Sequence, residues 1–222
     1  MRDFDAVVFD MDGVIFDSER GMMQCWLEVA ERRGIRGLEK PYMACIGTNA
    51  ARTKEIMLDA YGADFPYDAV AKEASGRYHE KYDGGRLPVK PGVHEILEFL
   101  EKSGKRIALA SSTRRQTVVD QLRDAHILDF FEAVITGDMV TKSKPEPEIF
   151  LLACEKIGTP PERAYAVEDS HNGIRAARRG GLHPIMVPDL LPANEEMRLL
   201  SEAVLGSLTD VITFLRGGET HR

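Results

Sequence analysis

Two aspartates separated by one residue, Asp10 and Asp12, follow a short apolar run at residues 6–9. Such a run is typical of a buried strand of a parallel sheet, so both carboxylates are expected at the carboxyl edge of a central strand. Two carboxylates this close need a cation or a proton between them when they are withdrawn from water. Asp17 lies close behind, and clustered carboxylates are preferred ligands of hard divalent cations. The stretch from Asp10 to Asp17 therefore predicts a metal site.

Polar side chains also occur at or near the ends of three later segments. They are Ser111 and Ser112, Lys144, and Glu168 with Asp169. Because parallel strands end at the same edge of a sheet, we expect these groups to meet Asp10 and Asp12 in one crevice. A divalent ion and a lysine can neutralise a phosphate, while hydroxyl and backbone N–H groups hold its oxygens. The stretch after Ser111 leads into a predicted helix, whose N-terminus favours anions.

The order of the predicted elements indicates how these groups are positioned. From residue 91 onward, strand-like apolar runs alternate with amphipathic helical segments, which is typical of a parallel sheet with right-handed crossovers. The predicted strands span residues 6–9, 106–110, 133–135, 164–167 and 183–187. The predicted helices of this part span residues 93–103, 114–125, 148–157, 173–179 and 208–215. Thr113 is the expected N-cap of the second of these helices.

The segment between about residue 17 and residue 88 differs in character from the rest of the chain. It is poor in strand signals, and its clearest helical segments lie at residues 22–33, 54–61 and 67–82. Gly84, Gly85 and Pro88, which are typical of turns and loops, mark its end. We therefore predict an α/β fold with a Rossmann-like parallel sheet core at residues 1–16 and 89–222, and an inserted all-helical cap domain at residues 17–88.

Composition and charge argue against several classes of protein. The chain has 222 residues with 43 % hydrophobic residues, and its net charge of −7 disfavours nucleic acid as a partner. No apolar stretch approaches the ~20 residues of a membrane span, and no signal-peptide pattern is visible. The three cysteines lack metal-ligand spacing and fit buried thiols in a reducing compartment. We expect a cytoplasmic protein without a membrane partner, present as a monomer or weak dimer.

Four motifs occur in order along nearly the whole chain, and their combination is far more specific than any one of them. They are DMDGVIFDS at residues 10–18, LASS at residues 109–112, SKPEPEIF at residues 143–150 and VEDSHNGI at residues 167–174. This set resembles the motifs of the haloacid dehalogenase superfamily, in its phosphatase branch and close to β-phosphoglucomutase-like proteins. The helical insert resembles the cap of that family, which closes over the substrate, with Ser18 and Pro88 near its hinges.

The resemblance implies a chemical role for the residues of the crevice. Asp10 would be the nucleophile that forms an aspartyl-phosphate, and Asp12 would be the general acid and base. Ser111, Ser112 and Lys144 would bind the transferred phosphoryl group, and Lys144 would also count among the catalytic residues.

The resemblance also implies a cofactor and a reaction. Mg²⁺ would be bound by Asp10, by Asp169 and by Asp12 through its backbone carbonyl. Glu168 would be a further ligand or would accept hydrogen bonds behind the ligands. The expected reaction is the hydrolysis of a small phosphate monoester, such as a sugar phosphate or a similar phosphorylated metabolite.

Two alternative functions stay open at this point. A phosphomutase on the same scaffold would resemble members with a histidine after the nucleophile loop and an arginine and a lysine in the cap. An ungapped comparison places Met22, Ala50 and Ala74 at those positions, which disfavours a mutase. A catalytically silent binding or regulatory protein has no need for the intact motif set. Dehalogenase members lack the second aspartate, so the presence of Asp12 disfavours that chemistry.

Overall fold

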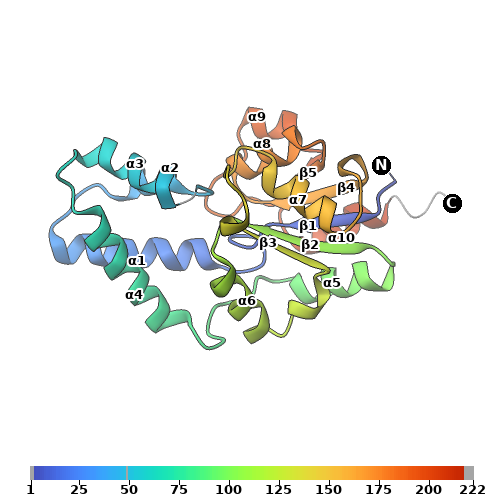
Figure 1. The fold of residues 1–222 in the computed structure, drawn as a ribbon, viewed down its shortest axis with the longest axis horizontal. Coiled ribbons are helices and arrows are strands. Elements are labelled where there is room, and N and C mark those ends of the chain that lie inside the picture. Colours follow the sequence, from blue (N-terminus) through green and yellow to red (C-terminus); the bar gives the residue numbers. More distant parts are fainter. Residues whose placement is uncertain (1–2, 49, 218–222) are drawn as a thin grey trace.

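The computed structural model describes residues 3–48 and 50–217, which form an α/β core and a group of helices beside it (Figure 1). In the described residues six parallel strands lie in the order β3-β2-β1-β4-β5-β6. The strands are β1 (Ala6–Phe9), β2 (Arg106–Ser111), β3 (Ala133–Thr136), β4 (Ala164–Glu168), β5 (His183–Met186) and β6 (Ala203–Val204). The predicted Rossmann-like parallel sheet is confirmed, and β1 lies at its centre.

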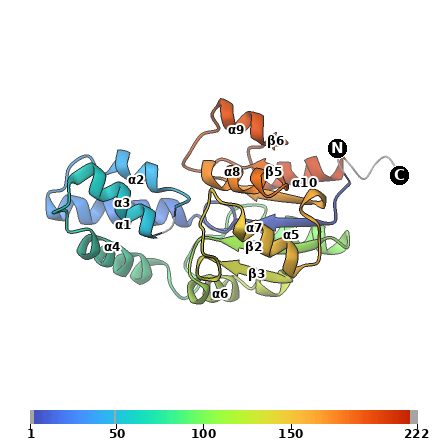
Figure 2. The same cartoon turned by 45° about the horizontal axis from the view of Figure 1, so that its top comes forward.

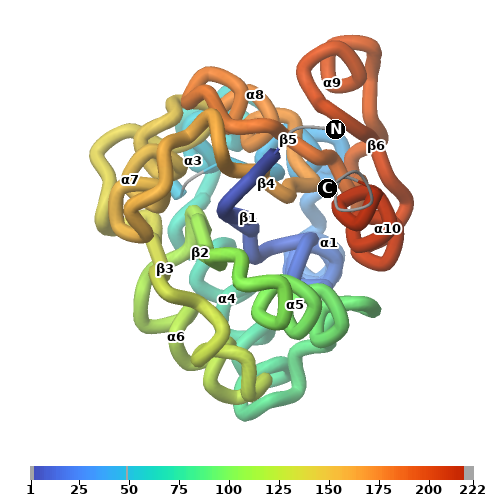
Figure 3. The backbone as a smooth tube through the Cα atoms, turned by 90° about the vertical axis from the view of Figure 1, so that its right-hand side faces the viewer, coloured from blue at the N-terminus to red at the C-terminus, as the bar shows by residue number. Residues whose placement is uncertain are grey.

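Helices cover both faces of this sheet. The core helices are α5 (Val93–Lys102), α6 (Arg115–Asp124), α7 (Glu148–Lys156), α8 (His171–Arg179), α9 (Glu195–Leu200) and α10 (Leu208–Arg216). Figure 3 shows α5 and α10 on one side of the sheet and α7 and α8 on the other. Sequence reasoning missed α9 and β6, because six and two residues are too short to establish a periodicity.

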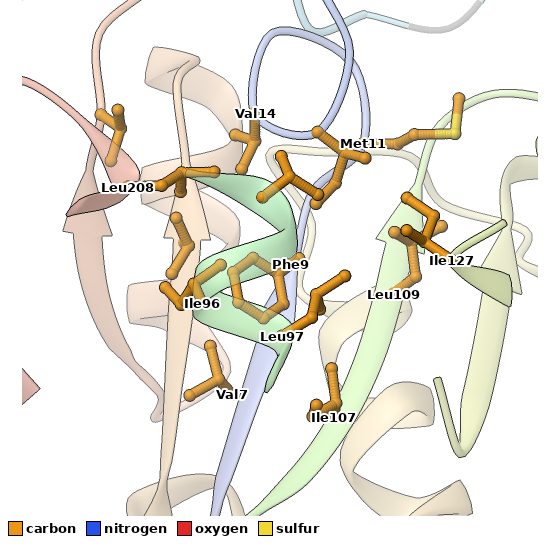
Figure 4. Packing of buried hydrophobic residues seen from close by; sticks show 14 of the residues in the cluster. Val7, Phe9, Met11, Val14, Ile96, Leu97, Ile107, Leu109, Ile127 and Leu208 are labelled. Atoms are coloured by element: carbon orange, nitrogen blue, oxygen red, sulfur yellow. The ribbon is translucent and has the colours of Figure 1, made fainter. Parts of the chain in front are cut away.

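The two faces of the sheet carry side chains of different size, because successive residues of a strand point to opposite sides. The face that packs against α5 and α10 carries Val7, Phe9, Ile107 and Leu109 (Figure 4), and also Tyr165 and Val167. The opposite face carries Ala6, Val8, Ala108, Ala110, Ala164 and Ala166. Each large side chain contributes roughly 1.5–3 kcal/mol by its burial, whereas the alanines let α7 and α8 approach closely. Burial on both faces fixes the central strands, and with them the loops at their carboxyl edge.

Between β1 and α5 the described residues form four inserted helices, which lie to one side of the core (Figures 1 and 2). They are α1 (Ser18–Arg33), α2 (Glu39–Cys45), α3 (Ala50–Tyr61) and α4 (Tyr67–Tyr82). Their apolar faces enclose a separate cluster that includes Trp26, Tyr42, Met57, Tyr67 and Val70. The first helix begins at Ser18 rather than at the predicted residue 22, and α2 was not predicted. Seven residues with a proline in the first turn give α2 a weak helical signal.

The two chain connections to these helices run side by side as a short ribbon. Phe16 and Val89 form an antiparallel bridge. The Asp17 backbone N–H donates to the Pro88 carbonyl at 3.0 Å, and the Lys90 N–H donates to the Ile15 carbonyl at 2.9 Å. We call residues 15–17 and 88–90 the connecting ribbon. Separately, no helix among the described residues combines the length and apolar content needed to cross a membrane.

Candidate active site

The turn after β1 brings its two aspartates to the carboxyl edge of the sheet. The Asp10 N–H donates to the Val167 carbonyl of β4 at 2.9 Å, so the ladder continues one residue beyond β1. Gly13 has a φ of +80°, and a Cβ at this position would overlap the Asp169 carboxylate. Glycine tolerates this backbone conformation and has no Cβ. The turn can therefore bring the first acidic pair close to the later Glu168–Asp169 pair.

Lys144 is buried between carboxylates from two strand ends. Its Nζ donates to Asp10 Oδ1 at 2.5 Å, to Glu168 Oε1 at 2.6 Å and to the Ala110 carbonyl at 3.1 Å. Burial lowers the pKa of Lys144, but the Asp10 and Glu168 carboxylates outweigh burial and the net shift of the pKa is upward. All three ammonium donors have acceptors, so this lysine is a fixed positive charge beside Asp10.

Glu168 is fully buried and accepts hydrogen bonds on both carboxylate oxygens. Its Oε1 accepts from Lys144, and its Oε2 accepts from the Asp169 N–H, the Ser170 N–H and the Ser170 hydroxyl, each at 3.0 Å. Glu168 therefore holds both Lys144 and the loop that carries Asp169.

Three carboxylates form one compact group. Asp10, Glu168 and Asp169 each offer an oxygen within 4.8 Å of the others. Burial raises the pKa of Asp10 to about 8; Lys144 opposes this shift, and Glu168 and Asp12 reinforce it. Burial also raises the pKa of Asp169, and Glu168 and Asp10 add to that rise.

The same group contains a buried oxygen with no hydrogen-bond partner in the described part of the chain, Asp169 Oδ2. A divalent cation offsets the repulsion between like charges that are buried together, and it gives an unpartnered carboxylate oxygen a partner. Hard oxygen donors are the ligands that Mg²⁺ takes. The donor set therefore fits the metal that the sequence predicts.

Asp12 lies in a different environment from Asp10. Its Oδ1 accepts from the Ser18 hydroxyl at 2.6 Å, while its Oδ2 accepts from the Thr113 hydroxyl at 2.9 Å and from the Ser111 hydroxyl at 3.3 Å. These donors come from α1 and from the end of β2, so hydroxyl groups on two sides fix the Asp12 carboxylate. The Asp12 side chain is outside the compact acidic group.

A cavity of about 450 Å³ opens over these acids. Its sheet side is lined by Asp10, Asp12, Ser112, Thr113, Arg114, Thr117, Gln121, Lys144, Asp169 and Ser170. Its helical side is lined by Ser18, Glu19, Met22, Gly47, Thr48, Ala50, Ser75, Tyr78 and His79. The structure thus brings Asp10, Asp12, Ser112, Lys144 and Asp169 to one cavity wall. Ser111 and Glu168 are fully buried just outside the lining and hold its members in place.

Two expectations from the sequence are wrong in detail. Asp17 does not join the acidic group; it lies in the connecting ribbon, where its Oδ1 is 3.4 Å from Arg20 Nε. Thr113 does not cap α6, because its hydroxyl is bound to Asp12. Asp138, which is remote in sequence, accepts instead from the N–H of Arg115, the first residue of α6, at 3.1 Å.

Of the three positions that were compared with mutases, two line the cavity and one does not. Met22 and Ala50 line the cavity. Ala74 is buried in the cluster of the inserted helices, and its neighbour Ser75 lines the cavity instead. Neither Met22 nor Ala50 can bind an anion through its side chain.

Glu19 is a cavity residue that sequence reasoning missed. It lies in the first turn of α1 beside Ser18. Burial and the nearby Asp12 and Asp10 charges together raise the pKa of Glu19 to about 8, against a smaller lowering by the Gly47 backbone. Its position directly after the first motif could have indicated from the sequence that Glu19 lies near the site.

The loop between α2 and α3 contacts the sheet side of the cavity. Gly47 has a φ of +73°, and a Cβ there would lie 2.7 Å from Ser170 Oγ and 2.8 Å from Ser170 Cβ. Real side chains do not approach a neighbour so closely. Only glycine therefore lets this loop of the inserted helices meet the loop after β4.

Comparisons with known proteins agree with this geometry. The sequence model of the haloacid dehalogenase-like hydrolase family matches residues 4–181. The phosphorylated carbohydrates phosphatase of Thermotoga maritima is 32 % identical over 184 residues, which cover 82 % of this chain and 83 % of that protein. Hexitol phosphatase B of Escherichia coli is 27 % identical over 221 residues, 93 % of each protein.

Solved structures show the same similarity. The crystal structure of CbbY from Rhodobacter sphaeroides in complex with phosphate has a TM-score of 0.76 at 26 % identity, covering 94 % of this chain and 96 % of that chain. A β-phosphoglucomutase from Clostridium difficile has a TM-score of 0.80 at 21 % identity, covers 96 % of each chain and shares the fold. The chain therefore belongs to the haloacid dehalogenase-like hydrolases, as a phosphatase with the β-phosphoglucomutase-like fold.

Proposed function

We propose that the protein hydrolyses a small phosphate monoester in a Mg²⁺-dependent reaction, through an aspartyl-phosphate formed on Asp10. The observation that carries this proposal is the position of Asp10 on the cavity wall, between the Lys144 ammonium and the unpartnered oxygen of Asp169. Asp12 faces the same cavity. A nucleophile, a fixed cation and a separate proton carrier are the groups that this chemistry needs.

The reaction has two balanced half-reactions. An Asp10 oxygen attacks phosphorus, the bond from phosphorus to the leaving oxygen breaks, and Asp12 protonates that oxygen. Water then attacks the aspartyl-phosphate, Asp12 takes a proton from the water, and the bond between phosphorus and Asp10 breaks to release inorganic phosphate. The positive charge of Lys144 attracts the phosphoryl oxygens, the Ser112 hydroxyl binds them, and Ser111 keeps Asp12 in place.

The proposed Mg²⁺ ligands are Asp10, Asp169 and the backbone carbonyl of Asp12, with Glu168 orienting this group from behind. When bound, the ion supplies positive charge that offsets the negative charge on the phosphoryl group. Lys144 supplies a second positive charge from the protein itself.

We also propose that residues 17–88 form a mobile cap domain on a core of residues 1–16 and 89–222, with the connecting ribbon as its hinge. The inserted helices supply one side of the cavity, and Gly47 packs against the core at Ser170. Closure of such a cap excludes water from the reacting groups and completes the substrate site.

The lining of the cavity favours a hydroxylated substrate, such as a sugar phosphate or a sugar-alcohol phosphate. Hydroxyl and amide groups line it at Thr48, Ser75, Tyr78, Thr117 and Gln121. Such groups pair well with substrate hydroxyls. The names of the two phosphatase relatives, which refer to phosphorylated carbohydrates and to hexitol, support the same class.

A phosphomutase is disfavoured by the helical side of this lining. A mutase binds a second phosphate there, which requires cations at defined places. Among the described lining residues, the inserted helices contribute His79 but neither lysine nor arginine.

Two assays separate the candidate functions. With p-nitrophenyl phosphate we expect phosphate release that needs Mg²⁺ and stops when a chelator is added. A folded protein with no turnover would indicate a catalytically silent protein. Turnover that is unchanged by the chelator would indicate a different chemistry. With glucose 1-phosphate and a bisphosphate primer, formation of glucose 6-phosphate without free phosphate would establish a mutase.

Stabilisation by Mg²⁺ should increase with pH. Because the folded protein raises the pKa of Asp10 to about 8, the protonated carboxyl favours folding of the metal-free protein at low pH. This contribution is lost as the pH rises through that value. Mg²⁺ competes with the proton, so its affinity should fall by up to about tenfold for each pH unit below 8. The shift of Tm on adding Mg²⁺, measured between about pH 6 and about pH 9, tests this; an equal shift throughout would contradict it.

Substituting Gly47 with alanine should impair turnover far more than stability. The new Cβ meets Ser170 only when the loop contacts the core, so we expect kcat/KM to fall by at least about tenfold. Gly37 has a φ of +70° and no atom within 4 Å of an added Cβ, which makes Gly37→Ala a matched control. Both variants should lose about 1 kcal/mol of folding free energy through backbone strain. Equal kcat/KM values in the two variants would show that this contact is unimportant.

A further inference from the structure

One buried carboxylate of the core contacts both the connecting ribbon and the first turn of α1. Asp189 follows β5 at the carboxyl edge of the sheet, and its side chain is only 5 % exposed. Its Oδ1 accepts from Arg20 Nη2 at 3.0 Å and from Lys90 Nζ at 2.8 Å. Arg20 belongs to the first turn of α1, and Lys90 belongs to the connecting ribbon. These two cations come from chain segments 70 residues apart and meet on a single oxygen.

The position of Arg20 links this ion pair to the catalytic groups. Ser18 and Glu19 lie in the same first turn of α1 as Arg20. The Ser18 hydroxyl donates to Asp12 at 2.6 Å, and Glu19 lines the cavity. A rotation of this turn would therefore move the hydrogen-bond donor that holds Asp12. Arg20 is restrained by Asp189, and also by Asp17 of the ribbon at 3.4 Å.

We propose that Asp189 is a positioning residue. It fixes the connecting ribbon and the first turn of α1 against the catalytic edge of the sheet, and through Ser18 it keeps Asp12 aligned. The Lys90–Asp189 pair is the stronger of the two, because the Lys90 side chain is 21 % exposed and the Arg20 side chain is 58 % exposed, and a pair withdrawn from water is screened less than an exposed one. The expected effect on turnover rests on the proposed phosphatase function, whereas the expected effect on the ribbon does not.

Hydrogen exchange tests whether Asp189 stabilises the connecting ribbon, and it requires no assay of activity. The Asp17 and Lys90 amides are bonded across the ribbon, so their exchange rates report how often it opens. In Asp189→Asn we expect both amides to exchange about tenfold faster, while the strands β1, β2 and β4 keep their protection.

Asp5→Asn is the control for the loss of an ion pair. Asp5 precedes β1 at the opposite edge of the sheet and pairs with Arg163. We expect this variant to leave both ribbon amides at their original rates. If Asp189→Asn fails to fold, Lys90→Gln tests the same contact from the ribbon side and should accelerate the same two amides.

Steady-state kinetics test the link to Asp12. A residue that aligns the proton carrier should affect kcat more than KM, so we expect Asp189→Asn to lower kcat about tenfold with KM changed less than about threefold. Unchanged exchange in Asp189→Asn and Lys90→Gln would overturn the proposal, as would equal acceleration throughout the protein. If the unmodified protein hydrolyses no phosphate ester, the phosphatase proposal fails and the exchange data still decide the role of Asp189.

Discussion

Replacing Asp10 with asparagine is expected to lower turnover of a phosphate ester by about 10⁴-fold or more while the protein stays folded. An amide is too weak a nucleophile to replace the carboxylate. The fold should survive because Lys144 keeps hydrogen bonds to Glu168 and to the Ala110 carbonyl. Burial raises the pKa of Asp10 to about 8, which means that its charge opposes folding near neutral pH. The metal-free Asp10→Asn variant should therefore be slightly more stable than the unmodified protein.

This expectation is checked by kcat for p-nitrophenyl phosphate with Mg²⁺ and by Tm in the presence of a chelator. Asp5→Asn serves again as the control, since it makes the same chemical change on the far side of the sheet. Residual activity within about tenfold of the unmodified protein would refute a covalent role for Asp10.

Replacing Asp12 with alanine should slow mainly the breakdown of the phosphorylated enzyme. The p-nitrophenolate ion leaves without a proton, so the first half-reaction depends little on Asp12, whereas the attack by water needs a base. We expect a rapid release of about one p-nitrophenolate per enzyme, followed by turnover slower by roughly 10²–10⁴-fold.

A second variant separates proton transfer from geometry. Asp12→Asn keeps one oxygen that can accept from either Ser18 or Thr113, and its NH2 group can donate to the other hydroxyl oxygen, but it cannot act as a base. We expect it to show the same initial release and slow turnover as Asp12→Ala. Loss of metal binding in both variants, with a normal rate of breakdown of the intermediate, would contradict the acid–base role.

The convergence of the site was predictable because it follows from topology. Asp10, Lys144 and Asp169 are far apart in sequence, yet parallel strands end at one edge and their loops must meet there. The sequence also placed Ser111 and Glu168 at this edge. It could not show that these two lie just behind the cavity wall, because depth depends on side-chain packing rather than on position along a strand.

Features that depend on contacts between distant segments were not predictable. Glu19 faces the cavity because α1 starts four residues earlier than its apolar pattern indicates. The contact of Gly47 with Ser170 and the pairing of Asp189 with Arg20 arise only once the inserted helices rest against the core. No local pattern encodes such pairings.

The central claim is that Asp10 captures the phosphoryl group, and mass spectrometry of the quenched enzyme tests it most directly. Asp12→Ala would be mixed with p-nitrophenyl phosphate and Mg²⁺, stopped with acid during the slow phase, and digested. We predict one added phosphoryl group on the peptide that contains Asp10, absent when a chelator replaces Mg²⁺ and absent in the Asp10→Asn protein. A phosphoryl group on any other residue, or turnover with no phosphorylated peptide at all, would contradict this account.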